Sequence, residues 1–397
     1  MKITKVDVFQ FRCDVPIPNR PVGCRIYTDE GIYGDGEGSM SYGTGSEAAF
    51  GMIEALANMI IGMDPLDNEV IWDKMHRTTF WGQSPGPVVF SGISAIDIAL
   101  WDIKGKVCNM PLYRLLGGKQ RQDLRCYASQ LQHGFKGYHD FAFSTDKYVE
   151  VSKYVVDELG YDAIKIDFLT FDRDPKLPPL TNEQRRGPMS PYFVQLAEER
   201  VAAVREAVGP NVDIIIENHS NLDALSAIQL ARAVEKYNIF FFEEPNTPSP
   251  KTAKYIRESI SIPIANGERI FSRWQYAPYF EDMSIQIAQP DLTSCGGLTE
   301  GKKICDMAHT YDVAVQAHVC GTPLSTALSL HLESAIPNFI IHEQHCVCLH
   351  QYMKDLCVHD YQPVKGRFVT PELPGIGNEW TEKAMTEARM KKTVTKD

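Results

Sequence analysis

From about residue 125 onward, apolar runs rich in β-branched residues alternate with segments of helical periodicity. The runs lie at residues 125–129, 162–168, 213–218, 239–245, 262–268, 285–291, 313–319 and 339–344. Continuous apolar strands that alternate with amphipathic helices predict a parallel sheet covered by helices. Eight such units favour a closed (β/α)₈ barrel over a doubly wound sheet, since no glycine-rich phosphate-binding sequence follows the first strand.

Residues before about 125 follow a different pattern, in which strands come first and helices follow. Residues 22–28 and 32–37 flank the turn Asp29-Glu30-Gly31 and predict a β-hairpin. Segments with helical periodicity come next, at 48–61, 65–77 and 91–106. Gly117-Gly118 then marks the end of a helix. This order predicts a separate α+β unit.

The two patterns divide the chain into three parts. We predict an α+β capping domain over 1–124, a (β/α) barrel over 125–354, and a C-terminal segment, 355–397, that packs on the capping domain. An insertion rich in proline and charge, 170–190, follows the second predicted barrel strand. It is too long for a plain βα loop and lies where barrel active sites form. It could shape the pocket, form an oligomer contact or extend into solvent.

The composition limits the partners of the chain. The formal net charge is −11 and Lys and Arg form no run, so we expect no nucleic-acid partner. No stretch approaches the roughly 20 apolar residues of a membrane span. Residues 1–7 alternate like a strand and lack the apolar core of a signal peptide. The ten cysteines are scattered without paired CxxC spacings. We therefore expect a cytoplasmic enzyme with reduced thiols and no membrane partner.

Three acidic residues each end an apolar run: Glu217, Glu243 and Glu268. They are about 25 residues apart, which is the length of one strand-plus-helix unit. Consecutive parallel strands would bring the three carboxylates to one face, where they would repel one another. A hard divalent cation stabilises such a cluster, and Mg²⁺ takes oxygen ligands in octahedral geometry. The pattern therefore predicts a Mg²⁺ site formed by these three residues.

Motifs spread over nearly the whole chain resemble the enolase superfamily, in particular its mandelate racemase-like branch of acid-sugar dehydratases. The matching residues are Glu217, 243–245, 267–274, 289–291, 296–301 and His318, with 95–106 and 115–118 near the N-terminus. The resemblance implies an α+β capping domain over a modified (β/α) barrel with Mg²⁺ at the strand ends. It also selects Glu243 over Glu244 as the metal ligand. Members of this superfamily use a Lys or His base with Mg²⁺ that stabilises an enediolate.

His318 ends the seventh apolar run, where it could be a core residue or a base. Asp291 ends the preceding run, and a neighbouring carboxylate can fix the tautomer of an imidazole and raise its basicity. The resemblance implies that these two residues are the base and its orienting partner. It also implies that Glu343, at the end of the eighth run, donates a hydrogen bond to the substrate carboxylate. That role requires a protonated Glu343 with a raised pKa, which a dry, anionic site would favour.

His219 follows Glu217 by two residues, so both side chains can point to the same side of the strand end. In dehydratases similar to galactonate dehydratase, a His at this position is the acid that protonates the departing hydroxyl; the alternative is a polar residue that lines the mouth. Lys165-Ile166-Asp167 departs from the Lys-x-Lys of many members of the branch, which weakens a two-base racemase. Lys165 could pair with a carboxylate or assist as a base, and Asp167 could contact the substrate.

The leading hypothesis is Mg²⁺-dependent dehydration of a sugar acid, an aldonate or aldarate, in carbohydrate catabolism. A hydrogen next to a carboxylate is weakly acidic, so its removal needs strong stabilisation of the enediolate. His318 would remove the C2 proton and His219 would help to expel the C3 hydroxyl, giving a 2-keto-3-deoxy acid. The alternatives are an acid-sugar epimerase, racemase or cycloisomerase, and a non-catalytic metabolite-binding or regulatory barrel. We expect a homo-oligomer whose specificity comes from capping loops at 14–20, 41–46 and 81–84.

Overall fold

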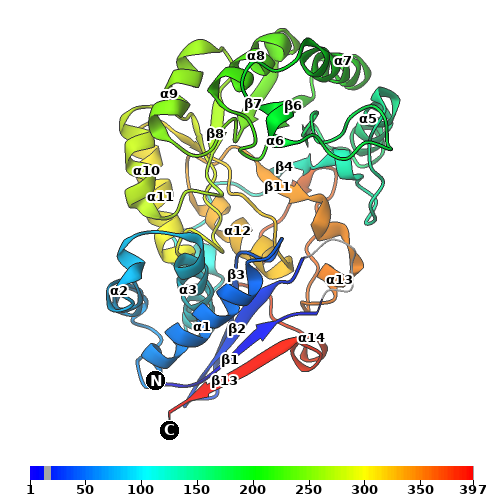
Figure 1. Cartoon of the computed structure of the whole chain (residues 1–397). Helices are drawn as coiled ribbons and strands as arrows, with labels where there is room; N and C mark the ends of the chain where they lie inside the picture. Colours follow the sequence, from blue (N-terminus) through cyan, green and yellow to red (C-terminus); the bar gives the residue numbers. More distant parts are fainter. Residues whose placement is uncertain (13–18, 397) are drawn as a thin grey trace.

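The computed structural model describes residues 1–12 and 19–396 of the 397-residue chain. Within this part, the strands form an antiparallel sheet and a parallel sheet that lie at opposite ends of the molecule in Figure 1. The antiparallel sheet has the order β13-β1-β2-β3, and the parallel sheet has the order β10-β9-β8-β7-β6-β5-β4-β11. The predicted combination of a barrel-like α/β unit and a separate α+β unit is confirmed.

The N-terminal region supplies most of the antiparallel sheet. Its strands and helices are β1 (Ile3–Gln10), β2 (Val22–Thr28), β3 (Tyr33–Gly38), α1 (Ser46–Ile60), α2 (Asn68–Thr78), η1 (Trp81–Gln83), α3 (Pro87–Val107) and α4 (Leu112–Leu115). β2 and β3 pair antiparallel, which confirms the predicted hairpin. α4 ends two residues before Gly117, and both Gly117 and Gly118 have positive φ, 111° and 104°, as expected of a helix stop.

The C-terminal segment contacts both parts of the molecule. Its elements are η5 (Cys346–Leu349), α13 (Gln351–Lys354), β12 (Arg367–Phe368), α14 (Glu382–Thr386) and β13 (Met390–Thr395). β12 pairs antiparallel with β4 of the barrel. β13 pairs antiparallel with β1, so the two chain ends lie close together in Figure 1. The boundaries at 124/125 and 354/355 remain predictions.

Each of the predicted barrel runs overlaps a strand. These are β4 (Leu124–Ser129), β5 (Ala163–Ile166), β6 (Asp213–Glu217), β7 (Ile239–Glu243), β8 (Ile264–Asn266), β9 (Ile287–Ala288), β10 (Ala314–Val315) and β11 (His342–His345). Neighbours pair in parallel from β11 through β4 to β10. A parallel bridge between Val315 and Phe339 joins β10 to the segment that leads into β11. The sheet therefore curls back on itself, as a modified barrel requires.

Helices cover the outside of this sheet (Figure 1). They are η2 (Leu131–His133), α5 (Thr145–Lys153) with its π-helical end η3 (Tyr154–Glu158), α6 (Asn182–Arg185), α7 (Pro191–Val208), α8 (Ala224–Val234), η4 (Glu235–Tyr237), α9 (Pro250–Ser259), α10 (Ser272–Glu281), α11 (Gly297–Thr310) and α12 (Pro323–Ala335). Local sequence explains several ends. Asp223 and Ser226 form a capping box at the start of α8, and α7 ends at Gly209, whose φ is 79°.

The capping domain is held on the barrel by contacts between α3 and the start of α11. Ser94 Oγ accepts hydrogen bonds from the backbone N–H groups of Gly296 and Gly297, both at 3.0 Å. Asp97 accepts from Thr299 N at 2.9 Å and Thr299 Oγ1 at 2.5 Å. Because these groups are buried, the capping domain has a defined position over the carboxyl ends of the barrel strands.

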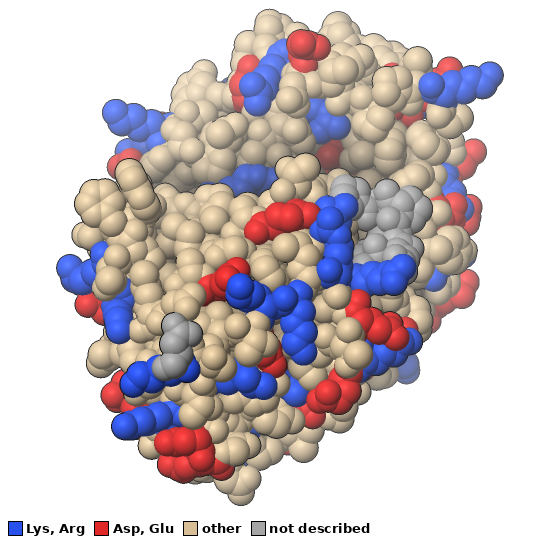
Figure 2. Space-filling view, turned by 60° about the horizontal axis from the view of Figure 1, so that its bottom comes forward, with Lys and Arg blue, Asp and Glu red and all other residues tan. Residues whose placement is uncertain are grey.

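Acidic and basic side chains are interspersed on the face shown in Figure 2. Within the described residues, no helix is long and apolar enough to cross a membrane, and every cysteine is a free thiol.

Candidate active site

Alternating side chains of the barrel strands build the floor of the site. One side of each strand faces the barrel interior, where Tyr127, Ala163, Ile215, Phe241, Ala265, Ile287 and Ile341 form a separate apolar cluster. Because side chains alternate along a strand, the residue two positions further on points to the same side. On four strands that residue is ionisable: Lys165, Glu217, Glu243 or Glu343. A charged layer therefore lies directly above an apolar floor, at the carboxyl ends of the strands.

Lys165 lies among three carboxylates of this layer. Its Nζ is 2.6 Å from Glu243 Oε1, 2.8 Å from Glu343 Oε1 and 3.2 Å from Glu217 Oε2. Burial alone would lower the pKa of Lys165, but the three carboxylates raise it well above its ordinary value. Lys165 is therefore positively charged, which favours the charge-pairing role over the role of a base.

Two of the predicted metal ligands are neighbours in the sheet. Glu217 and Glu243 are Cα partners at the ends of β6 and β7, and both are buried. Burial raises the pKa of Glu243 to about 8; Glu217 and Glu343 add to this shift, while Lys165 opposes it. Glu243 Oε2 also accepts a hydrogen bond from Gln289 Nε2 at 2.7 Å. Glu243 thus has two carboxylate neighbours, Glu217 and Glu343, and one cationic neighbour, Lys165.

The third predicted ligand, Glu268, lies just beyond β8 and contacts the predicted base. Glu268 Oε2 is 2.7 Å from His318 Nε2, and its other oxygen pairs with Arg269. His318 Nδ1 is 2.7 Å from Asp291 Oδ2, so the predicted His–Asp pair is formed. Burial lowers the pKa of His318, but Glu268 and Asp291 together raise it well above its ordinary value. Arg269 Nη1 also pairs with Glu244, so it bridges Glu244 and Glu268.

His219 lies beside Glu217, as its spacing predicted. Its Nε2 is 3.1 Å from Glu217 Oε1, and its Nδ1 is 3.9 Å from Asp167 Oδ2. The residue has a φ of 46°, a left-handed conformation that directs the ring across the strand end. Burial lowers the pKa of His219, but Glu217 and Asp167 raise it to about 9. The imidazole is therefore protonated near neutral pH, as an acid must be.

The expected protonation of Glu343 is wrong in this arrangement. Burial raises its pKa, but Lys165 and His318 outweigh this effect and lower the pKa below its ordinary value. Its oxygens accept hydrogen bonds from Ser129 Oγ at 2.7 Å and from Val319 N at 3.0 Å. The sequence reasoning did not foresee that Lys165 would pair with Glu343, because the two lie on strands that are not adjacent.

The chemistry of the donor set decides whether the site fits a divalent cation. Within residues 1–12 and 19–396, no group of three or more His, Cys, Asp or Glu side chains is arranged to hold a metal ion, and the carboxylate oxygens contact Lys165, His318 and Arg269 instead. The site nevertheless combines the carboxylates of Asp167, Glu217, Glu243, Glu244, Glu268, Asp291 and Glu343 with the permanent cations Lys165, Arg185 and Arg269. This acidic excess and the oxygen donors fit Mg²⁺.

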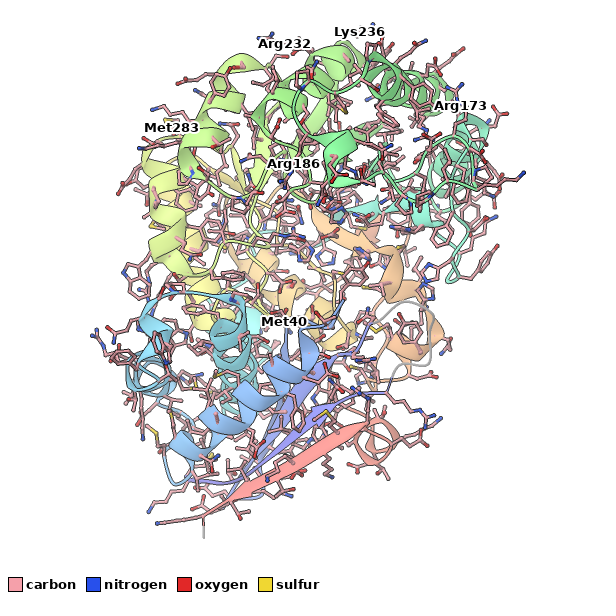
Figure 3. All side chains as sticks on the ribbon, viewed as in Figure 1. Met40, Arg173, Arg186, Arg232, Lys236 and Met283 are labelled. Carbon is pink, nitrogen blue, oxygen red and sulfur yellow. The ribbon has the colours of Figure 1, made fainter. Side chains whose placement is uncertain are left out.

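A cavity of about 1150 Å³ opens above the charged layer and is lined by both domains. The capping domain supplies residues of the predicted 41–46 loop, among them Tyr42, and also Met40, which Figure 3 labels on that side. Of the predicted 14–20 loop, residues 14–18 lie outside the described residues and Asn19 lines the cavity. Among the described residues that line the cavity, none comes from 81–84; Pro87 lines it instead.

Several cavity residues were missed by the sequence reasoning. Glu37 at the end of β3 is buried and accepts hydrogen bonds from Thr322 Oγ1 at 2.6 Å and Thr322 N at 3.0 Å. His133 has a pKa that burial lowers to about 4. Arg185 reaches the cavity from the 170–190 insertion, which places that insertion at the site. Strand alternation could have identified His345, two residues after Glu343, which also lines the cavity.

Arg273, which lies in the matching motif 267–274, has a structural position. Its Nε and Nη2 donate to Glu300 at 3.0 and 2.7 Å, and the guanidinium lies 4.7 Å from the ring centre of Trp274. It therefore braces α10 against α11.

Comparison with known families identifies both parts of the chain. The "Enolase C-terminal domain-like" model matches residues 147–384, and the "Mandelate racemase / muconate lactonizing enzyme, N-terminal domain" model matches residues 18–117. The chain belongs to the mandelate racemase/muconate lactonizing enzyme family of the enolase superfamily. The resemblance inferred from the motifs is confirmed.

Relatives of this family member include D-xylonate dehydratase of Haloferax volcanii, 32% identical over 89% of this chain and 81% of that protein. D-Galactonate dehydratase of Pectobacterium atrosepticum is 31% identical over 98% of this chain and 94% of that protein. A solved structure of an enolase superfamily member from Salmonella Typhimurium is 47% identical and covers 99% of this chain and 100% of that one, with a TM-score of 0.96.

Proposed function

We propose that this family member is a hydro-lyase that dehydrates a sugar acid to a 2-keto-3-deoxy acid. The observation that carries the proposal is the placement of two imidazoles, each beside carboxylates, across the barrel from each other. His219 follows β6 and His318 follows β10, and these strands are four places apart in the sheet order. One imidazole can therefore act on C2 and the other on the C3 hydroxyl of a substrate held between them. The names of the two dehydratase relatives agree with this chemistry.

His318 is the proposed base for the C2 proton. Asp291 accepts the hydrogen bond from Nδ1–H, which leaves Nε2 as the atom that receives the proton. Nε2 contacts Glu268 in this arrangement, so it becomes available only when another cation takes that carboxylate. Asp291 is itself fixed by Thr293, whose N and Oγ1 donate to its Oδ1 at 2.7 and 2.6 Å. The pair therefore has a defined orientation.

His219 is the proposed acid for the C3 hydroxyl. Hydroxide is a poor leaving group, so a positioned proton donor lowers the barrier to elimination. Glu217 and Asp167 outweigh burial and raise the pKa of His219 to about 9, which favours the protonated ring that an acid requires. Asp167 and Glu217 lie on either side of the ring and stabilise its charge.

Glu217, Glu243 and Glu268 would hold Mg²⁺, which supplies positive charge that stabilises the enediolate when it is bound. Lys165 adds a fixed positive charge below the substrate carboxylate and holds Glu217, Glu243 and Glu343 in place. The apolar cluster beneath the charged layer excludes water from the barrel side of the site.

The test is a screen of aldonates and aldarates with Mg²⁺, with detection of 2-keto acid product. We expect at least one to be dehydrated, and the His219→Gln variant to lose dehydration while it retains some exchange of the C2 hydrogen in D₂O. Dehydration by His219→Gln at the wild-type rate would show that His219 is not the acid. Accumulation of a C2 epimer without keto acid would assign the enzyme to epimerisation, and no turnover of any acid would support the non-catalytic alternative.

A further inference from the structure

Arg185 is carried into the site by the 170–190 insertion. It is the last residue of α6, a single helical turn whose start is fixed by a capping box between Thr181 and Gln184. Its side chain is 6% exposed and lines the cavity, whereas the next residue, Arg186, is exposed. Figure 3 labels Arg186 on the barrel side of the molecule. The insertion thus presents one arginine to the cavity and one to solvent.

Arg185 has a buried Nε atom without a hydrogen-bond partner in the described part of the chain. Within the described residues, its closest carboxylate contact is Nη1 to Asp167 Oδ2 at 3.9 Å, and its Nε atom is buried with no acceptor. The other permanent cations of the cavity differ: Lys165 contacts three carboxylates, and Arg269 pairs with Glu244 and Glu268. Burial of an unpaired guanidinium is costly, so this group is suited to bind a ligand that supplies the acceptor.

Asp167 provides the matching acceptor. Its Oδ1 is occupied by hydrogen bonds from Leu169 N at 2.9 Å and Asn218 Nδ2 at 3.3 Å. Its Oδ2 faces Arg185 Nη1 and His219 Nδ1, each at 3.9 Å, which is too long for a direct hydrogen bond. A gap of this size between a donor and an acceptor fits a bridging oxygen. A substrate hydroxyl can fill it, because it accepts from Arg185 and donates to Asp167.

We propose that Arg185 and Asp167 together bind the hydroxyl on the carbon that follows the leaving group, C4 of the sugar acid, and so select a substrate with a hydroxyl tail. The assignment rests on the proposed function, since it takes His219 as the group that faces the C3 hydroxyl. Asp167 lies between His219 and Arg185, so the next hydroxyl along the chain meets this donor–acceptor pair. Arg185 is thereby a specificity-determining residue, and this is the role of the insertion.

The experiment compares a dehydrated aldonate with its 4-deoxy analogue in wild type, Arg185→Gln and the matched control Arg186→Gln. For wild type, loss of the hydroxyl should reduce kcat/KM about ten- to a hundredfold, as expected of a hydrogen bond to a charged group. Arg185→Gln should show a similar loss with the parent aldonate, mainly through KM, and should no longer distinguish the two compounds. Arg186→Gln should behave like wild type, because its side chain is exposed.

Full discrimination between the two compounds by Arg185→Gln, which means an equal loss of kcat/KM on both, would overturn the proposal. If Arg185→Gln has a lowered unfolding temperature, the Arg185→Lys variant replaces it in the test. Lysine retains the positive charge but lacks the planar guanidinium, so this variant should lose part of the discrimination between the aldonate and its 4-deoxy analogue. Calorimetric titration of wild type with both compounds needs no turnover. If no acid is dehydrated, the proposed function fails. Weaker binding of the 4-deoxy compound than of the parent aldonate would still support the role of Arg185. Equal binding of the two compounds, or no binding of either, would overturn that role.

Discussion

At the scale of single residues, the carboxylates of the site outnumber the cations that pair with them. One ammonium, that of Lys165, contacts Glu217, Glu243 and Glu343 at once. Each carboxylate is buried, so none is screened by bulk water. Burial, together with Glu217 and Glu343, raises the pKa of Glu243, and the carboxylates beside His219 and His318 raise the pKa of both imidazoles.

Glu243→Gln tests the contribution of one carboxylate to metal binding. Mutation of groups that only support metal ligands costs about 10–100-fold in affinity or activity, so loss of a ligand should reduce turnover more than about a hundredfold and weaken Mg²⁺ binding. The fold should persist, because Lys165 retains Glu217 and Glu343 as partners. Titration calorimetry with Mg²⁺ and steady-state kinetics are the measurements. Glu258→Gln, an exposed site, is the matched control, and near-normal activity of Glu243→Gln would remove Glu243 from the ligand set.

His318→Asn and Asp291→Asn separate a base from its positioning partner. The first variant should lose both keto acid formation and exchange of the C2 hydrogen, because no group receives the proton. The second should retain a slower reaction, since the imidazole remains but loses the hydrogen bond that fixes its tautomer. Proton exchange is followed by NMR in D₂O. Persistent C2 exchange in His318→Asn would mean that another residue takes the proton.

At the scale of elements, the period of two along the strands places the chemistry. Apolar residues such as Ile215 and Phe241 fill the barrel, and the residues two further on, Glu217 and Glu243, emerge at its end. Loops then contribute further residues to the cavity. The 170–190 insertion, which the sequence left without a role, brings α6 to the cavity.

Thr181→Ala tests whether the capping box of α6 positions Arg185. Loss of an N-cap typically costs about 0.5–2 kcal/mol, and a single helical turn has no other cap to compensate. We expect KM for the substrate to rise several-fold with little change in global stability. Thr381→Ala, which removes the N-cap of α14 in the C-terminal segment, should leave KM unchanged. Identical KM values for both variants would show that α6 holds Arg185 without this cap.

At the scale of the whole molecule, the two chain ends are built into one unit. Trp380 is almost completely buried, its backbone N–H donates to Asp35 Oδ2 at 2.9 Å, and its ring centre lies 4.5 Å from that of Phe11. Asp35 in turn pairs with Arg25 at 2.7 Å. Trp380 of the C-terminal segment therefore packs on the antiparallel sheet, within the apolar cluster that also contains barrel residues such as Leu124.

Trp380→Ala should destabilise the protein strongly. Replacement of a buried Trp by Ala costs about 3–5 kcal/mol through lost burial and the remaining cavity, so the midpoint of chemical denaturation should fall. Trp81→Ala is the matched control, because Trp81 is 71% exposed and should change stability by less than about 1 kcal/mol. Similar denaturation curves for the two variants would contradict the assigned role of Trp380.

The sequence by itself determined the order of the elements, the eight strand positions and the residues at their carboxyl ends. These features depend on local periodicity and on the regular spacing of strand-plus-helix units, which is why Glu217, Glu243, Glu268, His219 and His318 could be named in advance. Tertiary structure decided which of these side chains pair. Lys165 contacts Glu343 and Arg185 approaches Asp167 only after the barrel has curled and the insertion has folded over it. Such contacts depend on distances between segments remote in the chain, and no local pattern encodes those distances. The tertiary structure also decided the ionisation states of the site residues, because these states depend on the same contacts and on burial.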